Sequence, residues 1–68
     1  MDIKNVFSYH APDCAQLDKY AAIRNAAQDL ARIIEANTPP CADQTAAIRK
    51  VREAVFTANA AIALNGTL

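Results

Sequence analysis

Two adjacent prolines near the middle of the chain, Pro39-Pro40, separate two stretches in which apolar residues recur every three or four positions. This spacing places the apolar residues on one side of an α-helix. No helix continues through two prolines, because proline lacks the backbone N–H and clashes with the preceding turn. The two stripes are Tyr20, Ile23, Ala27, Leu30 and Ile34 before the break, and Ile48, Val51, Val55, Ala58 and Ile62 after it.

The sequence therefore predicts an all-α fold, with one helical-hairpin domain over residues 1–68. Sixteen alanines and a single glycine favour closely packed helices. Two helices joined by a short loop form an antiparallel hairpin. We expect an extended or turn-like N-terminal segment at 1–12, a first helix at 13–36, a loop at 37–41 and a second helix at 42–65.

Local signals mark the ends of both helices. Asp13, followed by Gln16 three residues later, is typical of a helix N-cap, and Asn65-Gly66 is expected to stop the second helix. Cys41 is a candidate cap for the second helix. Cys14 and Cys41 would lie roughly 30 Å apart at opposite ends of the hairpin, too far for a disulfide, so we expect reduced thiols.

The second helix contains a run without charge, from Ala54 to Leu64. One partner helix covers only one side of such a run, and a helix that is apolar on nearly all sides is normally buried on nearly all sides. Ala47, Ala54 and Ala61, seven residues apart, would let another helix approach closely. We therefore expect a homo-oligomer in which these C-terminal halves pack together.

The stretch Phe7-Ser8-Tyr9-His10-Ala11-Pro12 places two aromatic residues and the single histidine directly before the first helix. Aromatic rings stack on flat bases, and a helix N-terminus attracts anions through its free N–H groups and its dipole. A small ligand with a base and a phosphate would suit this place. The alternative is that Phe7 and Tyr9 pack onto the helix and fix the direction of the chain.

A polar face follows along the first helix. Tyr20, Arg24 and Gln28 are one helical turn apart and share a side of the helix. The forked guanidinium of arginine suits phosphate, although a solvated surface arginine has the same spacing. Asn59 interrupts the apolar run, and we interpret it as a buried amide that fixes the register of the oligomer.

Several classes of function are disfavoured. Seven basic and seven acidic residues cancel, whereas duplex DNA binding needs a basic surface. No catalytic motif is present, and one histidine with two distant cysteines does not predict a metal site; we expect a non-enzymatic protein without a cofactor. No apolar run approaches 18 residues and no secretion signal appears, so we expect a soluble intracellular protein.

In its order of motifs, the chain resembles the hairpin domain shared by phage anti-CBASS and anti-Thoeris sponge proteins. The Tyr-His-x-Pro motif and the Ala-Asn-Ala motif together carry much of the specificity. The resemblance extends over nearly the whole chain. The matching pieces are Phe7–Pro12, Tyr20–Arg24, Ala27, Leu30-Ala31, Pro39-Pro40, Ala47–Lys50, Glu53–Val55 and Ala58–Ala63.

The resemblance implies a phage protein that forms a hexamer in the cytoplasm of the infected bacterial host. It would bind cyclic nucleotide messengers of host defence, such as cyclic GMP-AMP, without cleaving them. An N-terminal aromatic would stack on a base and a basic residue of the first helix would meet the phosphates, at a site between protomers. The matching positions are Tyr9 and Arg24, and we add His10 and Gln28 as neighbours.

Two departures from the family pattern bear on the ligand. Cys41-Ala42-Asp43 stands where family members usually carry Ser-Arg-Glu, and the missing arginine argues against a second site for cyclic trinucleotides. Thr57 replaces a usual tryptophan, which would alter packing near the oligomer centre. The alternative function is a structural hairpin oligomer or adaptor without a small-molecule ligand, which the apolar run of the second helix supports equally well.

Overall fold

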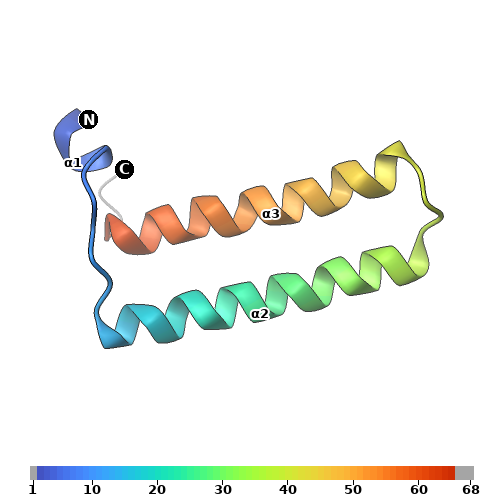
Figure 1. Ribbon diagram of the computed structural model, residues 1–68, viewed down its shortest axis with the longest axis horizontal. Helices are drawn as coiled ribbons and strands as arrows, with labels where there is room; N and C mark the ends of the chain where they lie inside the picture. Colours follow the sequence, from blue (N-terminus) through green and yellow to red (C-terminus); the bar gives the residue numbers. More distant parts are fainter. Residues whose placement is uncertain (1, 66–68) are drawn as a thin grey trace.

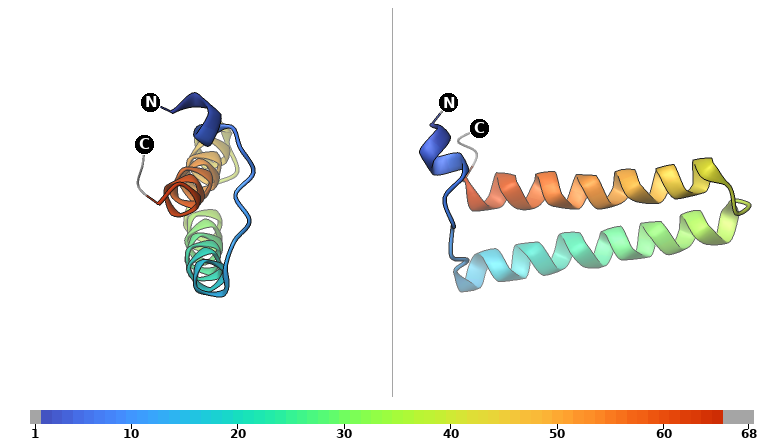
Figure 2. Two further views of the ribbon diagram at one scale, coloured as in Figure 1. Left: turned by 90° about the vertical axis from the view of Figure 1, so that its left-hand side faces the viewer. Right: turned by 45° about the horizontal axis from the view of Figure 1, so that its top comes forward.

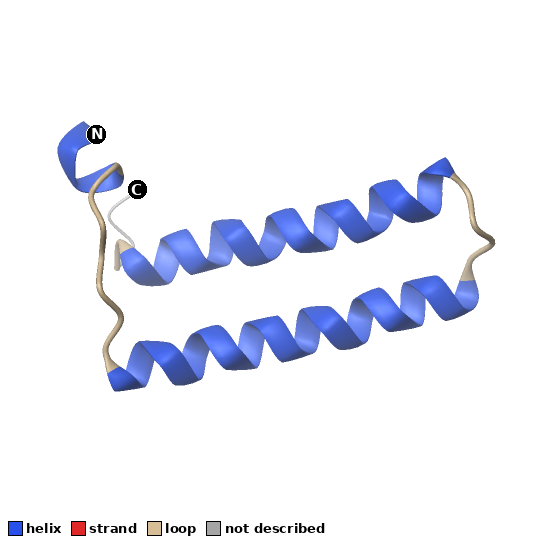
Figure 3. Ribbon diagram, in the orientation of Figure 1, coloured by secondary structure: helices blue, strands red, loops and turns tan. Residues whose placement is uncertain are grey.

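The computed structural model describes residues 2–65, which form three helices and no strand (Figure 3). Helix α1 spans Ile3–Val6, α2 spans Cys14–Asn37 and α3 spans Ala42–Ala63. Helices α2 and α3 lie side by side and antiparallel, so the part of the chain described measures 42 × 25 × 15 Å (Figure 1). The all-α hairpin expected from the two apolar stripes is confirmed.

Helix α2 begins where its capping residues predict. The Asp13 side chain accepts a hydrogen bond from the backbone N–H of Gln16 at 2.8 Å, and the Gln16 side chain accepts one from the N–H of Asp13 at 3.1 Å. This reciprocal pair is a capping box, which satisfies two backbone donors that the helix itself leaves free. The helix runs one residue further than expected, to Asn37, whose side chain donates to the carbonyl of Ile33.

Substitution of the cap should lower stability by a measurable amount. We expect Asp13→Ala to reduce the free energy of unfolding by about 1 kcal/mol, because the substitution leaves a backbone N–H at the helix start without its acceptor. Urea denaturation at one fixed protein concentration measures the change. Asp18→Ala, an exposed position further along α2, is the control. Equal losses in the two variants would contradict a specific capping effect.

The ends of α3 differ in part from the expectation. Cys41 occupies the N-cap position, but its side chain makes no capping hydrogen bond. The helix ends at Ala63, two residues before the expected end, and Asn65 adopts a left-handed φ of 50°. A single left-handed residue is a common way to end a helix, and asparagine tolerates it better than most residues. The expected stop at Gly66 lies outside the described residues.

The N-terminal segment contains a helical turn that was not expected. Asp2 caps α1 by accepting a hydrogen bond from the N–H of Asn5 at 3.1 Å. The Ser8 hydroxyl bonds to the carbonyl of Lys4, and His10 Nε2 donates to the carbonyl of Asn5 at 2.7 Å. Short-range polar contacts therefore fold this segment locally, and it then crosses the end of the hairpin to reach α2 (Figure 2).

Few side chains of the single hairpin are buried. Among residues 2–65 only Leu64 is buried, at 7% exposure, while the apolar stripes of both helices are mostly half-buried against each other. Several large apolar side chains remain exposed, including Leu30, Ile33 and Phe56. Within the described part of the chain, no helix is both long enough and apolar enough to span a membrane.

Polar contacts tie the two helices together at both ends. Near the start of α2, the Gln16 side chain donates to the carbonyl of Ile62 in α3 at 3.3 Å. Near the loop, the Gln44 side chain donates to the carbonyl of Glu35 at 3.3 Å and to that of Thr38 at 3.1 Å. These contacts set the register of the hairpin and so decide which side chains of α2 and α3 face each other.

Candidate functional site

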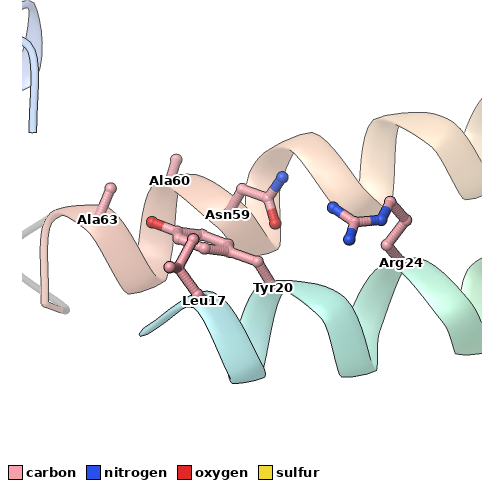
Figure 4. Close-up of a pocket in the computed structure, with 6 residues that line it drawn as sticks. All are labelled: Leu17, Tyr20, Arg24, Asn59, Ala60 and Ala63. Atoms are coloured by element: carbon pink, nitrogen blue, oxygen red, sulfur yellow. The ribbon is translucent and has the colours of Figure 1, made fainter. Parts of the chain in front are cut away.

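A hollow of about 410 Å³ lies between α2 and α3, near the end of the hairpin where α2 begins. A volume of this size is typical of small-molecule sites. The exposure of Leu17 and Arg24 keeps the hollow open to solvent. The lining residues are Leu17, Tyr20 and Arg24 from α2, and Asn59, Ala60 and Ala63 from α3 (Figure 4).

Three side chains give this hollow its chemistry. Figure 4 shows Asn59 directed from α3 toward α2, with the Tyr20 ring on one side of it and the Arg24 guanidinium on the other. Ala60 and Ala63 have short side chains, so α3 leaves room above the ring of Tyr20. An aromatic surface, a cation and an amide therefore surround one space.

Arg24 is free to bind an anion. It is exposed and forms no ion pair or side-chain hydrogen bond with any of the residues 2–65. By contrast, Arg32 lies 3.8 Å from Asp29 in an exposed ion pair. Because an unpaired guanidinium offers all five of its donors, Arg24 is the cation of α2 best placed to meet a phosphate.

Tyr9 and Phe7 project into solvent from the N-terminal segment. Tyr9 is 88% exposed and Phe7 is 84% exposed, so neither ring packs on the helices of its own chain. The alternative in which these rings anchor the segment to the hairpin is therefore wrong for the single chain. Tyr9 does not line the hollow that contains Arg24, although its segment crosses the same end of the hairpin (Figure 1).

The other two predicted site residues lie elsewhere. His10 is half-buried, and its Nε2 donates a hydrogen bond to the carbonyl of Asn5. Its Nδ1 atom is therefore left for a ligand. Gln28 is exposed and lines a separate hollow of about 260 Å³, one turn beyond Arg24, together with Arg32 and Glu35. A single protomer thus keeps the four predicted site residues apart.

Sequence reasoning did not place Tyr20 and Asn59 at the site. Tyr20 was assigned to the apolar stripe and to the side of the helix that Arg24 and Gln28 share, but not to the site, and Asn59 was assigned to an oligomer contact. Which residues of α2 and α3 face each other depends on the register that contacts such as Gln16 with Ile62 establish, and the spacing along each helix does not give this register. The second helix adds another pair that the sequence analysis missed: the Arg52 guanidinium carbon lies 5.3 Å from the centre of the Phe56 ring.

The groups that surround the hollow are suited to binding a ligand. Within residues 2–65, no three histidine, cysteine, aspartate or glutamate side chains cluster in a way that could hold a metal ion. Cys14 and Cys41 are both free and exposed. Stacking, an unpaired guanidinium and an amide are recognition chemistry for a ligand with flat rings and negative charge.

Comparison with known protein families gives a match over most of the chain. The family described as Acb2/Tad1, hairpin domain, matches residues 1–63, which is nearly the whole chain. No curated protein and no solved structure shows significant similarity to the chain.

Proposed function

The chain belongs to the Acb2/Tad1 hairpin-domain family, and from this premise we propose that it sequesters cyclic oligonucleotide messengers without cleaving them. Members of this family are phage anti-defence proteins that act as cyclic-nucleotide sponges. In the cytoplasm of an infected bacterium, the protein would hold the messengers of CBASS-type immunity away from their effectors. Sequestration needs a site that binds tightly and releases slowly, and it needs no catalytic group.

The observation that carries this proposal is the unpaired Arg24 beside an aromatic ring in the hollow between α2 and α3. A cyclic dinucleotide presents two phosphates and two bases. The guanidinium meets a phosphate with parallel hydrogen bonds, and the Tyr20 ring provides an apolar surface next to it. A protein that served only as a structural adaptor would have no need of this combination.

We propose that the site is completed by a second copy of the chain. Tyr9 is exposed in the single chain, so its ring is available to stack on a base held by a neighbouring protomer. A two-fold arrangement would present Tyr9 and Arg24 twice to one cyclic dinucleotide, which itself has two equivalent halves. His10 and Gln28 would act at the edge of this site.

The scarcity of buried side chains in the single hairpin supports such an assembly, which we propose to be a hexamer. Large exposed apolar patches normally mark contact surfaces, and here they comprise parts of both helices. A second hollow of about 490 Å³ is almost entirely apolar and lies along the hairpin between Ile23, Leu30, Val51 and Val55. Helices of other copies would cover these surfaces.

Cyclic dinucleotides are the preferred ligand class in this proposal, with cyclic trinucleotides as the second class. The loop that joins α2 and α3 contains Cys41, and neither it nor the following Ala42 offers a positive charge. A cyclic trinucleotide would therefore meet no positive charge at these two positions, and the next cations along α3 are Arg49 and Lys50. A calorimetric comparison of the two ligand classes tests this order of preference.

The bound messenger should be recovered intact. We expect that heating the complex releases the original cyclic dinucleotide, because the hollow contains no metal cluster and no paired carboxylates among the described residues. Chromatography of the supernatant after denaturation measures this, with the free ligand heated alone as the control. Linear products would show that the protein is an enzyme.

The structural adaptor remains the second candidate function, because Ile33 and Phe56 are 59% and 57% exposed on surfaces away from the hollow. Calorimetry separates the two functions. An adaptor would assemble but would give no heat with any cyclic di- or trinucleotide at micromolar concentration.

A further inference from the structure

We infer that Asn59 reads the bound base: its Oδ1 atom accepts a hydrogen bond from an amino group on the edge of a purine in the hollow. This inference rests on the proposed function and adds to it a determinant of base specificity. It gives Asn59 a role toward the ligand in place of the oligomer contact that the sequence alone favours.

The first argument is an unsatisfied acceptor. Asn59 Oδ1 is inaccessible to solvent and has no hydrogen-bond partner, and it is the one side-chain nitrogen or oxygen in this condition among the described residues. Buried polar atoms in folded proteins are almost always paired, and each exception needs an explanation. Asn59 lines the open hollow, so a turn of its amide toward the open side would let a donor from outside the chain remove the penalty of leaving this oxygen unpaired.

The second argument is the position of that oxygen. Asn59 lies in the hollow between Tyr20 and Arg24, and its side chain is directed across the hollow toward α2 (Figure 4). Arg24 offers only donors, which suit phosphate oxygens. Asn59 Oδ1 offers an acceptor that a phosphate cannot use. The two side chains therefore address different parts of one nucleotide.

The third argument is the chemistry of the bases. Adenine presents an amino group at position 6, and guanine presents one at position 2. Either amino group can donate to an amide oxygen, and side-chain amides are common partners of purine edges. A base stacked near the Tyr20 ring would bring its edge to Asn59, because the ring and the amide line the same space.

The inference is tested by measuring how the wild type and Asn59→Ala each respond to the loss of an amino group from the ligand. The first ligand pair is cyclic di-GMP and cyclic di-IMP, which differ by the 2-amino group. The second pair is cyclic di-AMP and its purine-riboside analogue, which lacks the 6-amino group. We first determine whether the wild type binds cyclic di-GMP or cyclic di-AMP more tightly. For the preferred ligand, we expect removal of its amino group to weaken binding to the wild type about tenfold. In Asn59→Ala the same ligand change should alter affinity less than twofold.

Asn25→Ala is the matched control, because Asn25 is exposed on α2 and lies outside the lining of the hollow. This variant should keep the wild-type preference for the amino group. Light scattering on all three proteins should give one mass, since a ligand contact does not set the assembly.

Other outcomes overturn the inference. Equal sensitivity of the wild type and Asn59→Ala to the loss of the amino group would show that no such hydrogen bond exists. A change of mass in Asn59→Ala would assign the amide to the contact between copies instead. Wild-type protein that binds none of these cyclic dinucleotides would remove the proposed function itself, and the inference with it.

Discussion

Arg24→Ala and Tyr9→Ala should each weaken cyclic-dinucleotide binding at least tenfold while the assembly keeps its mass. A charged hydrogen bond to phosphate contributes about 1.5–3 kcal/mol, and stacking on an aromatic ring contributes about 1–3 kcal/mol per base. A tenfold change in affinity corresponds to about 1.4 kcal/mol. If two protomers share one ligand, each substitution acts twice. Titration calorimetry measures both variants.

Two matched substitutions make this prediction specific. Lys19→Ala removes a positive charge from an exposed position of α2 outside the lining of the hollow. Phe7→Ala removes the other exposed ring of the N-terminal segment. Both should stay within about twofold of the wild type. If Lys19→Ala weakens binding as much as Arg24→Ala, general electrostatic attraction explains the affinity. If Phe7→Ala weakens binding more than Tyr9→Ala, Phe7 and not Tyr9 is the stacking ring.

Ala61→Glu should convert the assembly to monomers at micromolar concentration. Ala61 is exposed in the single chain and lies within the charge-free part of α3. If other copies cover this part, the new carboxylate is buried without a partner, which costs several kcal/mol as an order of magnitude. Sedimentation equilibrium measures the mass, and circular dichroism reports whether the helices persist.

Ala46→Glu is the control for that substitution. Ala46 is also exposed on α3, but it lies in the half that carries Arg49, Lys50 and Glu53. A glutamate at this position has Lys50 one turn further along the helix, an arrangement that is mildly stabilising. This variant should keep the wild-type mass. An Ala61→Glu protein of unchanged mass would show that the contacts between copies lie elsewhere.

The hairpin was predictable from the sequence because local physics determines most of it. The proline pair Pro39-Pro40 ends a helix whatever its tertiary surroundings. Asp13 and Gln16 start a helix through hydrogen bonds between residues three apart in the sequence. The short helix α1 was missed because its signals are few: one turn, capped by Asp2 through a single side-chain hydrogen bond. Such a turn leaves no periodic pattern to detect.

The site was less predictable because it depends on contacts distant in the sequence. That Arg24 would be exposed followed from its place off the apolar stripe. That Tyr20 would face Asn59 depends on the register between the helices, which contacts such as Gln16 with Ile62 establish. How Tyr9 meets a ligand depends on the arrangement of several copies, which a single chain does not contain.

One side chain at the base of the hairpin joins three parts of the molecule. Gln16 accepts from the backbone of Asp13 through its amide oxygen and donates to Ile62 through its amide nitrogen. Fraying at the start of α2 would therefore break a hydrogen bond to the last turn of α3, and unwinding of that turn would remove a partner of Gln16. The aromatic segment is attached directly before Asp13. Gln16 therefore couples the point where this segment joins α2 to the last turn of α3.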